Sequence, residues 1–538
     1  MSDELRTSGR RRALGRGALG ALSGLLAGYT ALGVAELVSA AVRPEAGPVV
    51  AVGGAAIDRT PTSLKTWAIR SFGANDKLVL QLGILGVLAL FALALGLLAA
   101  RHRRVGSAGV LLFGAVGALA ATSRPDSVGA RDALPSVVGA LVGAALLYRL
   151  AGRLRPAPRT AGPGGPEGPW GPGGSGWDRR GFLVAATTAA AASTGAGLLG
   201  RALHGADAER AVKARDRVTL PPPSSPASPV PRGAALRVPG ISPFTTPNAD
   251  FYRVDTALVV PKVVPSSWSL RIHGEGVTRA LRLSYDDLLR MPLIERDITL
   301  TCVSNEVGGP YAGTARWIGV PLAGLLARCG VEPPSRGGPA DQLVARSVDG
   351  MTLGTPVEDV MDGRDALLAL GMNGEPLPFA HGFPVRMVVP GLYGYVSACK
   401  WIEDIELTTF DAYDAYWVKR GWARRAPVKT QSRIDTPRPF ARPEPGTVMI
   451  AGVAWAQHRG ITTVEVRVDD GPWRRADLAA QDTRDTWRQW SLPWKATSGR
   501  HTLTVRATDG TGTPQTEERT RTVPDGASGW HSVLVTVR

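Results

Sequence analysis

The distribution of hydrophobic residues divides the chain into two unlike parts. Long apolar runs occupy the first 150 residues, whereas the last 300 mix short apolar and polar stretches as globular proteins do. An apolar run of about 17 residues or more is long enough to cross a bilayer as a helix. We therefore predict a helical bundle of four membrane spans within residues 1–155, at positions 17–42, 78–100, 105–121 and 134–150.

The charged residues that flank these runs predict their direction. Arginines precede the first span, fill the loop 101–104 and follow the fourth span, whereas the loops 43–77 and 122–133 mix acids and bases. Because Lys and Arg concentrate in cytoplasmic loops, we place the N-terminus, the 101–104 loop and residues 151–180 in the cytoplasm. Glu36, an acid inside the first span, is either a functional residue or a side chain that reaches the interface.

A Pro/Gly-rich linker at residues 156–178 precedes a fifth apolar run. This run opens with the residues WDRRGFL and continues rich in Ala, Thr and Gly. We assign residues 179–203 to a signal of the twin-arginine type that also forms a fifth transmembrane helix. An ordinary fifth helix flanked by two arginines is the alternative. Under both interpretations the protein is a multi-pass protein of the cell membrane, and the remaining chain lies on the extracytoplasmic side.

The exported part reads as a linker followed by two domains. Residues 204–240 form the linker, and residues 241–436 mix short strands and helices. From 437 to 538 strands and turns predict a β-sandwich. The individual elements that we expect are strands at 258–264, 268–272, 448–455, 463–469, 501–507 and 532–537, a helix at 284–289, a helix at 321–328, and a hairpin connection at 470–473.

The net charge is strongly positive, with 62 Lys and Arg residues against 46 Asp and Glu, a balance of +16. Nucleic-acid binding is the usual reading of such a charge. The chain has no aromatic–basic RNA motif and no recognition-helix pattern, however, and many of its arginines flank apolar runs. We therefore attribute the charge to membrane boundaries and expect no nucleic-acid partner.

Three cysteines, at 302, 329 and 399, form no CxxC pair, so neither a disulfide framework nor a zinc ribbon is expected. The sequence also has no CxxCH motif and no iron–sulfur set of cysteines. Cys329 fits a buried apolar residue near the end of the helix at 321–328. The role of Cys399 stays open, because it neighbours a basic residue, Lys400.

Cys302 stands where an apolar, strand-like run gives way to a polar, glycine-rich turn. The surrounding residues 299–309 read TLTCVSNEVGG, and the segments 315–322, 377–391 and 394–401 follow. A thiol at the end of a strand is well placed to bind a soft metal. In this order and at these intervals, the four segments resemble the molybdopterin-dependent sulfite oxidase family, in which one cysteine thiolate ligates molybdenum.

The resemblance covers roughly residues 240–520 and implies both fold and cofactor. It implies a sulfite-oxidase-like α+β molybdopterin domain at 241–436, and an immunoglobulin-like domain of the kind used for dimerisation at 437–538. The implied cofactor is Mo-molybdopterin, with Cys302 as its metal ligand. Arg386 would grip the cofactor phosphate through a planar fork of donors, while Lys400 adds a point charge. The complete set of cofactor contacts that we predict is Asn248, Tyr252, Arg253, Cys302, Ser347, His381, Arg386, Ser397 and Lys400.

Two further residues are candidates for catalysis beside Cys302. Tyr416 loosely matches an active-site tyrosine of the family, and Arg459 matches an arginine of its second domain. Packing or surface roles are the alternatives for both residues.

The chain departs from sulfite oxidases near the expected substrate pocket. Asn305 and Glu306 stand where sulfite oxidases carry arginine, and Val254-Asp255 replaces their Asn-His pair. An acid at this position weakens a pocket for anions. The substrate is therefore either a sulfur oxyanion or a sulfoxide, the latter as in a methionine sulfoxide reductase of the same superfamily.

The sequence thus predicts an exported, membrane-anchored molybdopterin oxidoreductase that transfers an oxygen atom in a two-electron reaction. The expected partners are a small-molecule substrate, a separate electron carrier or quinone, the twin-arginine translocase, membrane lipid and a second copy of the chain as a homodimer. A different class also fits the pattern. It is a non-catalytic polytopic membrane protein that displays a β-sandwich binding module and contains no metal.

Overall fold

The computed structural model describes residues 2–61, 64, 72, 76–124, 127, 129–154 and 179–538. The linker expected at 156–178 lies outside these residues. The chain divides into two compact units. One comprises Met1–Glu209 with Thr256–Val259, and the other comprises Arg210–Asp255 with Val260–Arg538.

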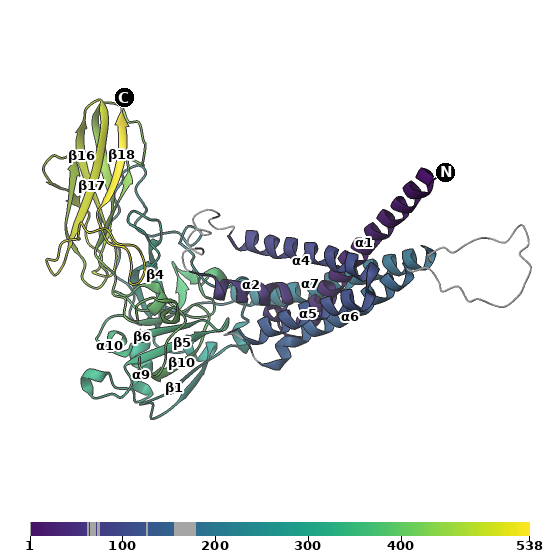
Figure 1. The fold of residues 1–538 in the computed structure, drawn as a ribbon. Coiled ribbons are helices and arrows are strands. Elements are labelled where there is room, and N and C mark those ends of the chain that lie inside the picture. Colours follow the sequence, from purple (N-terminus) through teal and green to yellow (C-terminus); the bar gives the residue numbers. More distant parts are fainter. Residues whose placement is uncertain are drawn as a thin grey trace, which may run out of the picture. The chain divides into compact units, whose positions relative to one another are not determined.

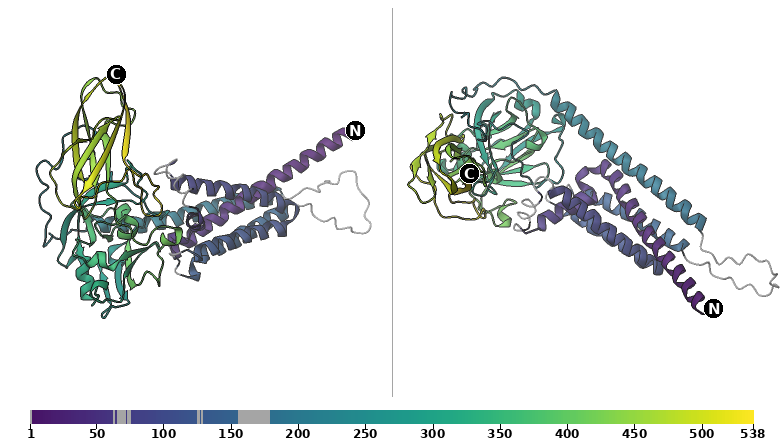
Figure 2. Two further views of the ribbon diagram at one scale, coloured as in Figure 1. Left: turned by 60° about the vertical axis from the view of Figure 1, so that its left-hand side comes forward. Right: turned by 90° about the horizontal axis from the view of Figure 1, so that it is seen from above.

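The first unit is a bundle of helices, labelled in Figure 1. They are α1 (Ser2–Val42), α2 (Pro48–Arg59), α4 (Asp76–Arg101), α5 (Arg103–Thr122), α6 (Leu134–Arg153) and α7 (Arg179–Asp216). In both views of Figure 2 the long helices run side by side, and α1 packs against α4 and α6. The short helix α2 falls in the segment 43–77, which the apolar pattern assigned to a loop.

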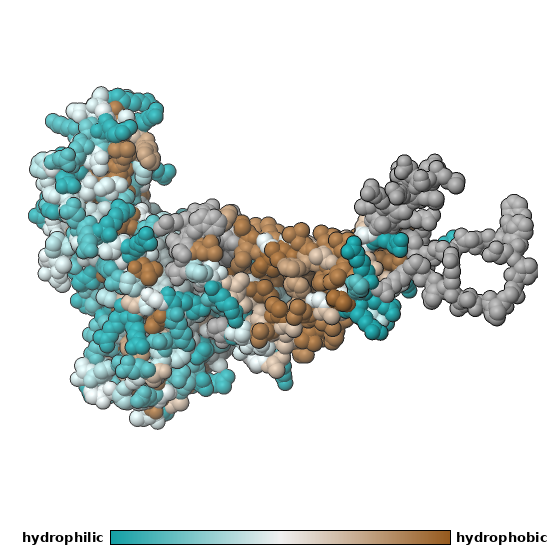
Figure 3. Space-filling view, viewed as in Figure 1, coloured by the Kyte–Doolittle hydropathy of each residue, from teal (hydrophilic) through white to brown (hydrophobic). Residues whose placement is uncertain are grey.

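Small residues allow these helices to approach closely, and large apolar side chains cover their outer faces. A Cβ atom on Gly96 would collide with the backbone of Gly20 and Gly24. Leu90, Leu112 and other large apolar side chains are exposed, and the helical part of Figure 3 is largely brown. Among the described residues, five helical stretches have the length and composition of membrane spans. They are Gly15–Val42, Leu78–Arg101, Arg103–Thr122, Ala130–Arg153 and Arg180–Asp216.

Helix α7 is longer than the sequence predicted. We expected this helix to end at residue 203 and a linker to begin at 204, but α7 continues to Asp216. Residues 204–216 are rich in Ala, Arg, Lys and Glu, which favour helix. Near the end of the helix, Arg215 donates to the carbonyl oxygens of Pro376 and Leu377 at 2.6 and 2.8 Å. The added turns also give Glu36 a partner, with His204 Nδ1 3.4 Å from its carboxylate.

The remaining part of the expected linker, residues 217–240, has no helix or named strand, but it lies against the following domain. Ser224 N donates to Leu293 O at 2.8 Å, and Ser225 forms a parallel bridge with Ile294. The segment is therefore attached to the second unit along its length.

The second unit begins with a domain of mixed α and β structure, as predicted. One sheet has the strand order β2-β1-β10-β5-β6, and the other has the order β3-β4-β7-β8 with β9 paired to β7. The strands are β1 (Ser269–Gly274), β2 (Leu281–Ser284), β3 (Ile294–Thr301), β4 (Ala312–Pro321), β5 (Gln342–Ser347), β6 (Thr352–Pro356), β7 (Leu367–Met372), β8 (Glu375–Pro376), β9 (Arg386–Val388) and β10 (Ile402–Thr408). Short helices α8 (Tyr285–Leu289), α9 (Leu322–Arg328), α10 (Val357–Met361) and α11 (Gly394–Ser397) connect them.

Two elements predicted from local sequence in this domain had different outcomes. The helix expected at 284–289 is α8, and Ser284 caps it by accepting from Asp287 N at 3.1 Å. The strand expected at 258–264 is wrong, because these residues belong to no strand. Pro261 cannot donate to a ladder. Leu258 instead packs in the helical unit, where a Cβ on Gly53 would lie 2.9 Å from Leu258 Cδ2.

The C-terminal domain is a sandwich of two four-stranded sheets with orders β11-β12-β16-β15 and β14-β13-β17-β18. The strands are β11 (Gln431–Thr436), β12 (Gly446–Trp455), β13 (Ile461–Val468), β14 (Arg474–Arg475), β15 (Asp477–Leu478), β16 (Arg488–Ala496), β17 (Gly499–Asp509) and β18 (His531–Val537). The four strands and the hairpin at 470–473 that we predicted are present, whereas β16 was missed. Since β11 pairs with β12, the sandwich begins before the predicted boundary at 437.

Candidate active site

Cys302 lies immediately after β3, where the antiparallel pair β3–β4 ends at Thr301 and Ala312. Its N–H donates to Tyr311 O at 2.9 Å, and its carbonyl oxygen accepts from Asn305 N at 3.0 Å. Asn305 Oδ1 accepts in turn from Tyr311 N at 2.8 Å. These bonds fix the backbone that carries the thiol, which is 9% exposed. A rigid strand end is a suitable mount for a metal ligand.

The sandwich domain holds strand β3 just before the cysteine. Gln457 Nε2 donates to Thr299 O and to Thr301 Oγ1, both at 2.9 Å. Trp487 N donates to Thr299 Oγ1 at 2.7 Å. All four residues are buried. The second domain therefore helps to position the cysteine. It does so through Thr299 and Thr301, and these hydrogen bonds do not involve the thiol itself.

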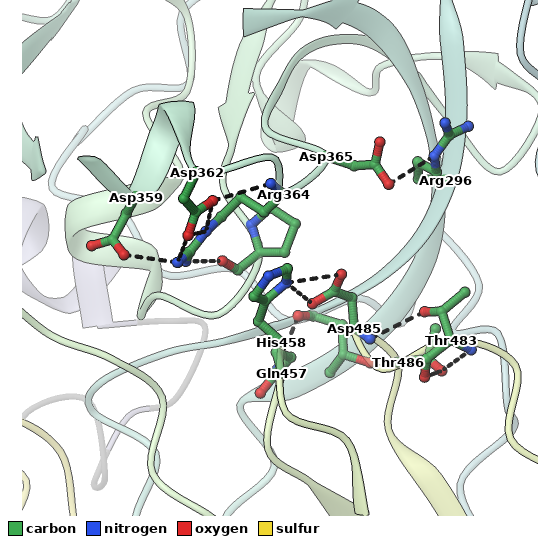
Figure 4. Close-up of polar contacts among 12 residues, drawn as sticks. Arg296, Asp359, Asp362, Arg364, Asp365, Gln457, His458, Thr483, Asp485 and Thr486 are labelled. Carbon is green, nitrogen blue, oxygen red and sulfur yellow. Dashed lines mark hydrogen bonds and ion pairs between the residues drawn. The ribbon is translucent and has the colours of Figure 1, made fainter. Parts of the chain in front are cut away.

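Further polar side chains lie next to this contact between β3 and the sandwich domain, as Figure 4 shows. His458 follows Gln457, and its Nδ1 lies 3.2 Å from Asp485 Oδ1. Nearby, Arg364 binds Asp359 and Asp362 at 2.7 and 2.6 Å. Arg364 also donates to Pro390 O at 2.8 Å, which ties these side chains to the segment that leads into α11.

Arg386 opens β9 and is 6% exposed. Its guanidinium lies 4.9 Å above the ring of Trp317, and Nη1 donates to His381 O at 3.2 Å. Its Nε is buried and has no hydrogen-bond partner among the described residues. Burial lowers the pKa of Arg386 to about 10. A buried cation with an unused N–H is suited to bind an anionic group.

His381 lies beside Arg386 and is also buried. Its Nε2 lies 3.0 Å from Asn248 O, so this nitrogen carries the proton that the carbonyl oxygen accepts. Burial and the positive charge of Arg386 lower the pKa of His381 to about 4. The imidazole is therefore neutral near pH 7, and its Nδ1 is available as an acceptor.

Lys400 brings a second cation to this region. Its Nζ lies 2.9 Å from Asp255 Oδ2 and 4.8 Å from the ring of Trp401. Arg253 also faces Asp255, with Nε at 3.7 Å from Oδ2, and it is more exposed than Lys400. Asp255, one of the residues that departs from the sulfite oxidase pattern, is thus the shared counter-ion of two predicted cofactor contacts.

The electrostatics around the thiol show which groups lie near it. Burial raises the pKa of Cys302, whereas hydrogen bonds from Ser304 and the charge of Lys400 act in the opposite direction. Burial likewise raises the pKa of the Tyr252 phenol, and a negative charge on Cys302 would raise it further. Tyr252 Oη is close to α11, since a Cβ on Gly394 would lie 3.9 Å from it. Tyr252 is therefore a protonated donor beside the cysteine.

Three other predicted cofactor contacts make hydrogen bonds within the protein. Asn248 Nδ2 donates to Glu375 Oε1 at 2.6 Å. Ser347 Oγ donates to Asp349 Oδ1 at 2.5 Å. Ser397 Oγ donates to Leu392 O and to Tyr393 O at 3.1 and 3.0 Å. Their roles toward a cofactor stay predictions.

The two additional catalytic candidates have structural contacts of their own. Tyr416 is buried, and the guanidinium of Arg420 lies 3.5 Å from its ring centroid. Arg459 Nε donates to Asp509 Oδ2 at 2.8 Å, and Nη2 donates to Val428 O at 2.9 Å. Both residues therefore contribute to packing or ion pairing, and their catalytic roles stay predictions.

The sequence analysis did not predict three residues that lie near the site or support it. Tyr393 is buried, and burial with the nearby charge of Cys302 raises its pKa. Trp317 supports the guanidinium of Arg386. Gln457 binds β3 from the other domain. Tyr393 and Trp317 lie in or next to the quoted motifs, but nothing in the local sequence marks Gln457.

Residues 257–417 match the family described as oxidoreductase molybdopterin binding domain. The chain is 30% identical over 306 residues to mitochondrial sulfite oxidase of Homo sapiens, covering 49% of this chain and 55% of that protein. It is 33% identical over 199 residues to NADH nitrate reductase 1 of Oryza sativa subsp. japonica, covering 33% and 21% of the two chains. The solved sulfane dehydrogenase SoxCD of Paracoccus pantotrophus is 26% identical, with a TM-score of 0.48 over 55% of this chain and 82% of that one.

The chain thus spans about half the length of the sulfite oxidase that it matches. These matches imply Mo-molybdopterin as the cofactor, and the residues present fit such a group. Arg386 has a buried, unpartnered Nε for an anion, and Cys302 offers a soft ligand on a rigid strand end. The region that matches the family, residues 257–417, is therefore a molybdopterin-binding oxidoreductase domain similar to that of sulfite oxidases.

Proposed function

We propose that this protein is a membrane-anchored oxidoreductase that transfers an oxygen atom at a molybdenum ligated by Cys302. The observation that carries the proposal is that Lys400 and Tyr252 lie within electrostatic range of the buried Cys302 thiol, and that the buried Arg386 lies within range of Tyr252. When bound, the cofactor supplies the two-electron oxygen-atom transfer. The protein supplies the fixed ligand and the charges around it.

Each group has a role that follows from its chemistry. Cys302 ligates the metal as a thiolate, because a thiol that coordinates a metal ion loses its proton. Arg386 and Lys400 offer positive charge to an anionic cofactor phosphate. The neutral His381 accepts a hydrogen bond through Nδ1. The protonated Tyr252 donates a hydrogen bond toward an oxygen of the substrate or cofactor.

The substrate that we propose first is a sulfur oxyanion such as sulfite, since sulfite oxidases are among the similar proteins. A sulfoxide is the second candidate. The placement of Glu306 beside the cysteine turn favours a neutral substrate, because a carboxylate repels anions. Turnover of the purified protein with sulfite and with methionine sulfoxide separates the two classes.

The proposed setting is the cell membrane, with the oxidoreductase domain on the extracytoplasmic side. The five apolar helical stretches and the positive flanks of their ends support this arrangement. Arg179 and Arg180 serve in the proposal as a twin-arginine signal, which suits a domain that folds around its cofactor before export. The immunoglobulin-like sandwich is the proposed dimer contact, as in the family that the sequence resembles.

Replacement of Cys302 tests the proposal directly. Cys302→Ser and Cys302→Ala are expected to lose bound molybdenum, measured by elemental analysis, together with at least about a hundredfold in turnover. Cys329→Ala is the matched control, since Cys329 is also buried but lies at the end of α9. Retention of both molybdenum and turnover in the two Cys302 variants would rule out the proposed site.

A further inference from the structure

The helical unit contains a partly open cavity of about 710 Å³, which we name the bundle cavity. Helices α1, α2, α4, α5 and α6 form its wall. Apart from Tyr29 and Ser136, the side chains that line it are apolar or the residues are glycines. Its volume falls within the range of about 300–1,000 Å³ typical of small-molecule sites.

Ser136 is an unpartnered polar group in this apolar wall. It is 4% exposed, and its buried Oγ has no hydrogen-bond partner among the described residues. Tyr29 differs, because its hydroxyl pairs with Thr194 Oγ1 at 2.9 Å. Leaving a hydroxyl buried without a partner costs free energy. An occupant with a carbonyl oxygen would satisfy Ser136, whereas a purely aliphatic chain would not.

A segment of the oxidoreductase domain belongs to the same unit as the cavity. Residues Thr256–Val259 pack with the helices, and a Cβ on Gly53 would meet Leu258 Cδ2 at 2.9 Å and Ile84 Cδ1 at 3.4 Å. Ile84 lines the cavity. Tyr252 precedes Leu258 by six residues, so their Cα atoms lie within about 22 Å even along a fully extended chain. Residues 253–257 therefore connect Tyr252 covalently to Leu258, in the segment that packs with the helices.

We propose that the bundle cavity binds the ring of a membrane quinone, which accepts the electrons released in the oxidoreductase domain. The proposal rests on the function proposed above. Oxidation of sulfite with water yields sulfate, two protons and two electrons, and the quinone takes up two electrons and two protons to become a quinol. The chain has three cysteines and no haem-attachment motif, so an organic two-electron acceptor suits it. Ser136 donates to one quinone carbonyl.

Two glycines of α4 provide a matched pair of variants. Gly83 lines the cavity and Gly86 does not, while an added Cβ meets nothing within 4 Å at either position. Gly83→Leu therefore adds bulk at the lining of the cavity without a collision at Cβ, and Gly86→Leu adds the same bulk elsewhere on the helix. Ser136→Ala removes the hydroxyl alone.

The test uses the full-length protein, loaded with cofactor, in nanodiscs of quinone-free phospholipid. Binding of decylubiquinone is measured by equilibrium dialysis without substrate, and sulfite oxidation is measured with decylubiquinone and with ferricyanide. We expect Gly83→Leu to weaken quinone binding at least about tenfold and Ser136→Ala about three- to tenfold, the effect of one lost hydrogen bond. Gly86→Leu should bind quinone as the unchanged protein does. Ferricyanide-coupled oxidation should persist in all three variants.

Two outcomes overturn the inference. One is quinone binding and quinone reduction in Gly83→Leu equal to those of the unchanged protein. The other is displacement of decylubiquinone by oleic acid at equal concentration, which would identify a lipid chain as the occupant. Failure of the unchanged protein to oxidise sulfite or to reduce methionine sulfoxide contradicts the proposed function instead. The substrate-free dialysis still decides whether quinone occupies the cavity.

Discussion

Arg386 is a buried charged residue whose burial costs stability and whose buried N–H suits it to bind an anion. Its guanidinium is buried over Trp317, and its Nε has no partner among the described residues. A buried charge without full pairing is unfavourable. The balance reverses when an anionic group enters, because the same N–H groups then make charge-assisted hydrogen bonds. The chemistry of Arg386 therefore suits a group that binds an anion better than a residue that stabilises the core.

Replacement of Arg386 by methionine should separate these two effects. We expect Arg386→Met to lower the molybdenum content at least about tenfold, because the phosphate loses its buried cation. The melting temperature of cofactor-free protein should stay equal or rise, since a desolvated charge is removed. Arg386→Lys retains the charge without the fork and should recover part of the molybdenum content. Normal molybdenum content in Arg386→Met would contradict the assigned role.

At the scale of elements, strand β3 depends on contacts from the sandwich domain. Gln457 reaches across the junction to Thr299 and Thr301, three residues and one residue before the cysteine. The strand itself is predictable, because apolar and β-branched residues alternate locally. The residue that stabilises the strand cannot be predicted locally, because Gln457 lies 158 positions from Thr299 and 156 positions from Thr301.

Gln457→Leu should weaken this support with little change in side-chain volume. The buried Thr299 carbonyl loses its donor, so we expect a loss of about 1–3 kcal/mol in the free energy of unfolding, visible as a lower melting temperature. Turnover should fall as the cysteine strand becomes less ordered. Gln481→Leu is the control, since Gln481 is exposed in the same domain. Equal melting temperatures for the two variants would show that the cross-domain hydrogen bonds contribute nothing.

The carboxylate pair at the same junction predicts a pH dependence. Burial raises the pKa of Asp482 from 3.8 to about 6, and the negative charge of Asp297 adds to this effect. The folded state therefore binds the proton more tightly than the unfolded chain does. The resulting stability is complete below about pH 4 and disappears as the pH rises through about 6.

Asp482→Asn should remove this dependence. Between pH 4 and pH 7 the unchanged protein should lose on the order of 1 kcal/mol relative to the variant, a value reduced for the partial exposure of Asp482. Melting temperatures of both proteins across this range provide the measurement. Parallel profiles would mean that Asp482 does not hold a proton in the folded state.

At the scale of the whole molecule, the chain combines a bundle of helices that are long and apolar enough to cross a membrane with a molybdopterin-binding oxidoreductase domain. Helix α7 links the two units covalently, since its residues belong to the first unit up to Glu209 and to the second from Arg210. In the proposed function this domain binds its cofactor before export, so it would have to be translocated in the folded state. The arginine pair at the start of α7 is the feature of the sequence that would direct it.

The double variant Arg179→Lys with Arg180→Lys distinguishes an export signal from an ordinary helix. It keeps both positive charges, so the positive-inside bias is unchanged. A twin-arginine signal requires arginine itself, and we expect the oxidoreductase domain of the variant to remain protected from protease added to spheroplasts. Arg201→Lys in the same helix should be exported normally. Unchanged protease sensitivity of the double variant would favour the ordinary helix.

Local sequence determined the features that depend on neighbouring residues. Apolar run lengths located the helices that are long enough to cross a membrane, and the capping serine predicted α8. The cysteine motif led to the molybdopterin domain, and the family match over residues 257–417 confirmed it. These predictions succeeded because hydrophobicity, capping and turn chemistry act over a few residues.

Tertiary contacts decided the remaining features. Helix α7 extends beyond residue 203, where Arg215 binds the carbonyls of Pro376 and Leu377, and residues 258–264 form no strand, since Leu258 packs in the helical unit. The sequence by itself therefore determined where the long apolar helices lie and that the chain contains a molybdopterin-binding domain, whereas the choice of Cys302 as the metal ligand stays a prediction. The three-dimensional packing alone decided the support of Cys302 by Gln457, the unpaired Nε of Arg386 and the bundle cavity, because each arises between residues far apart in the chain.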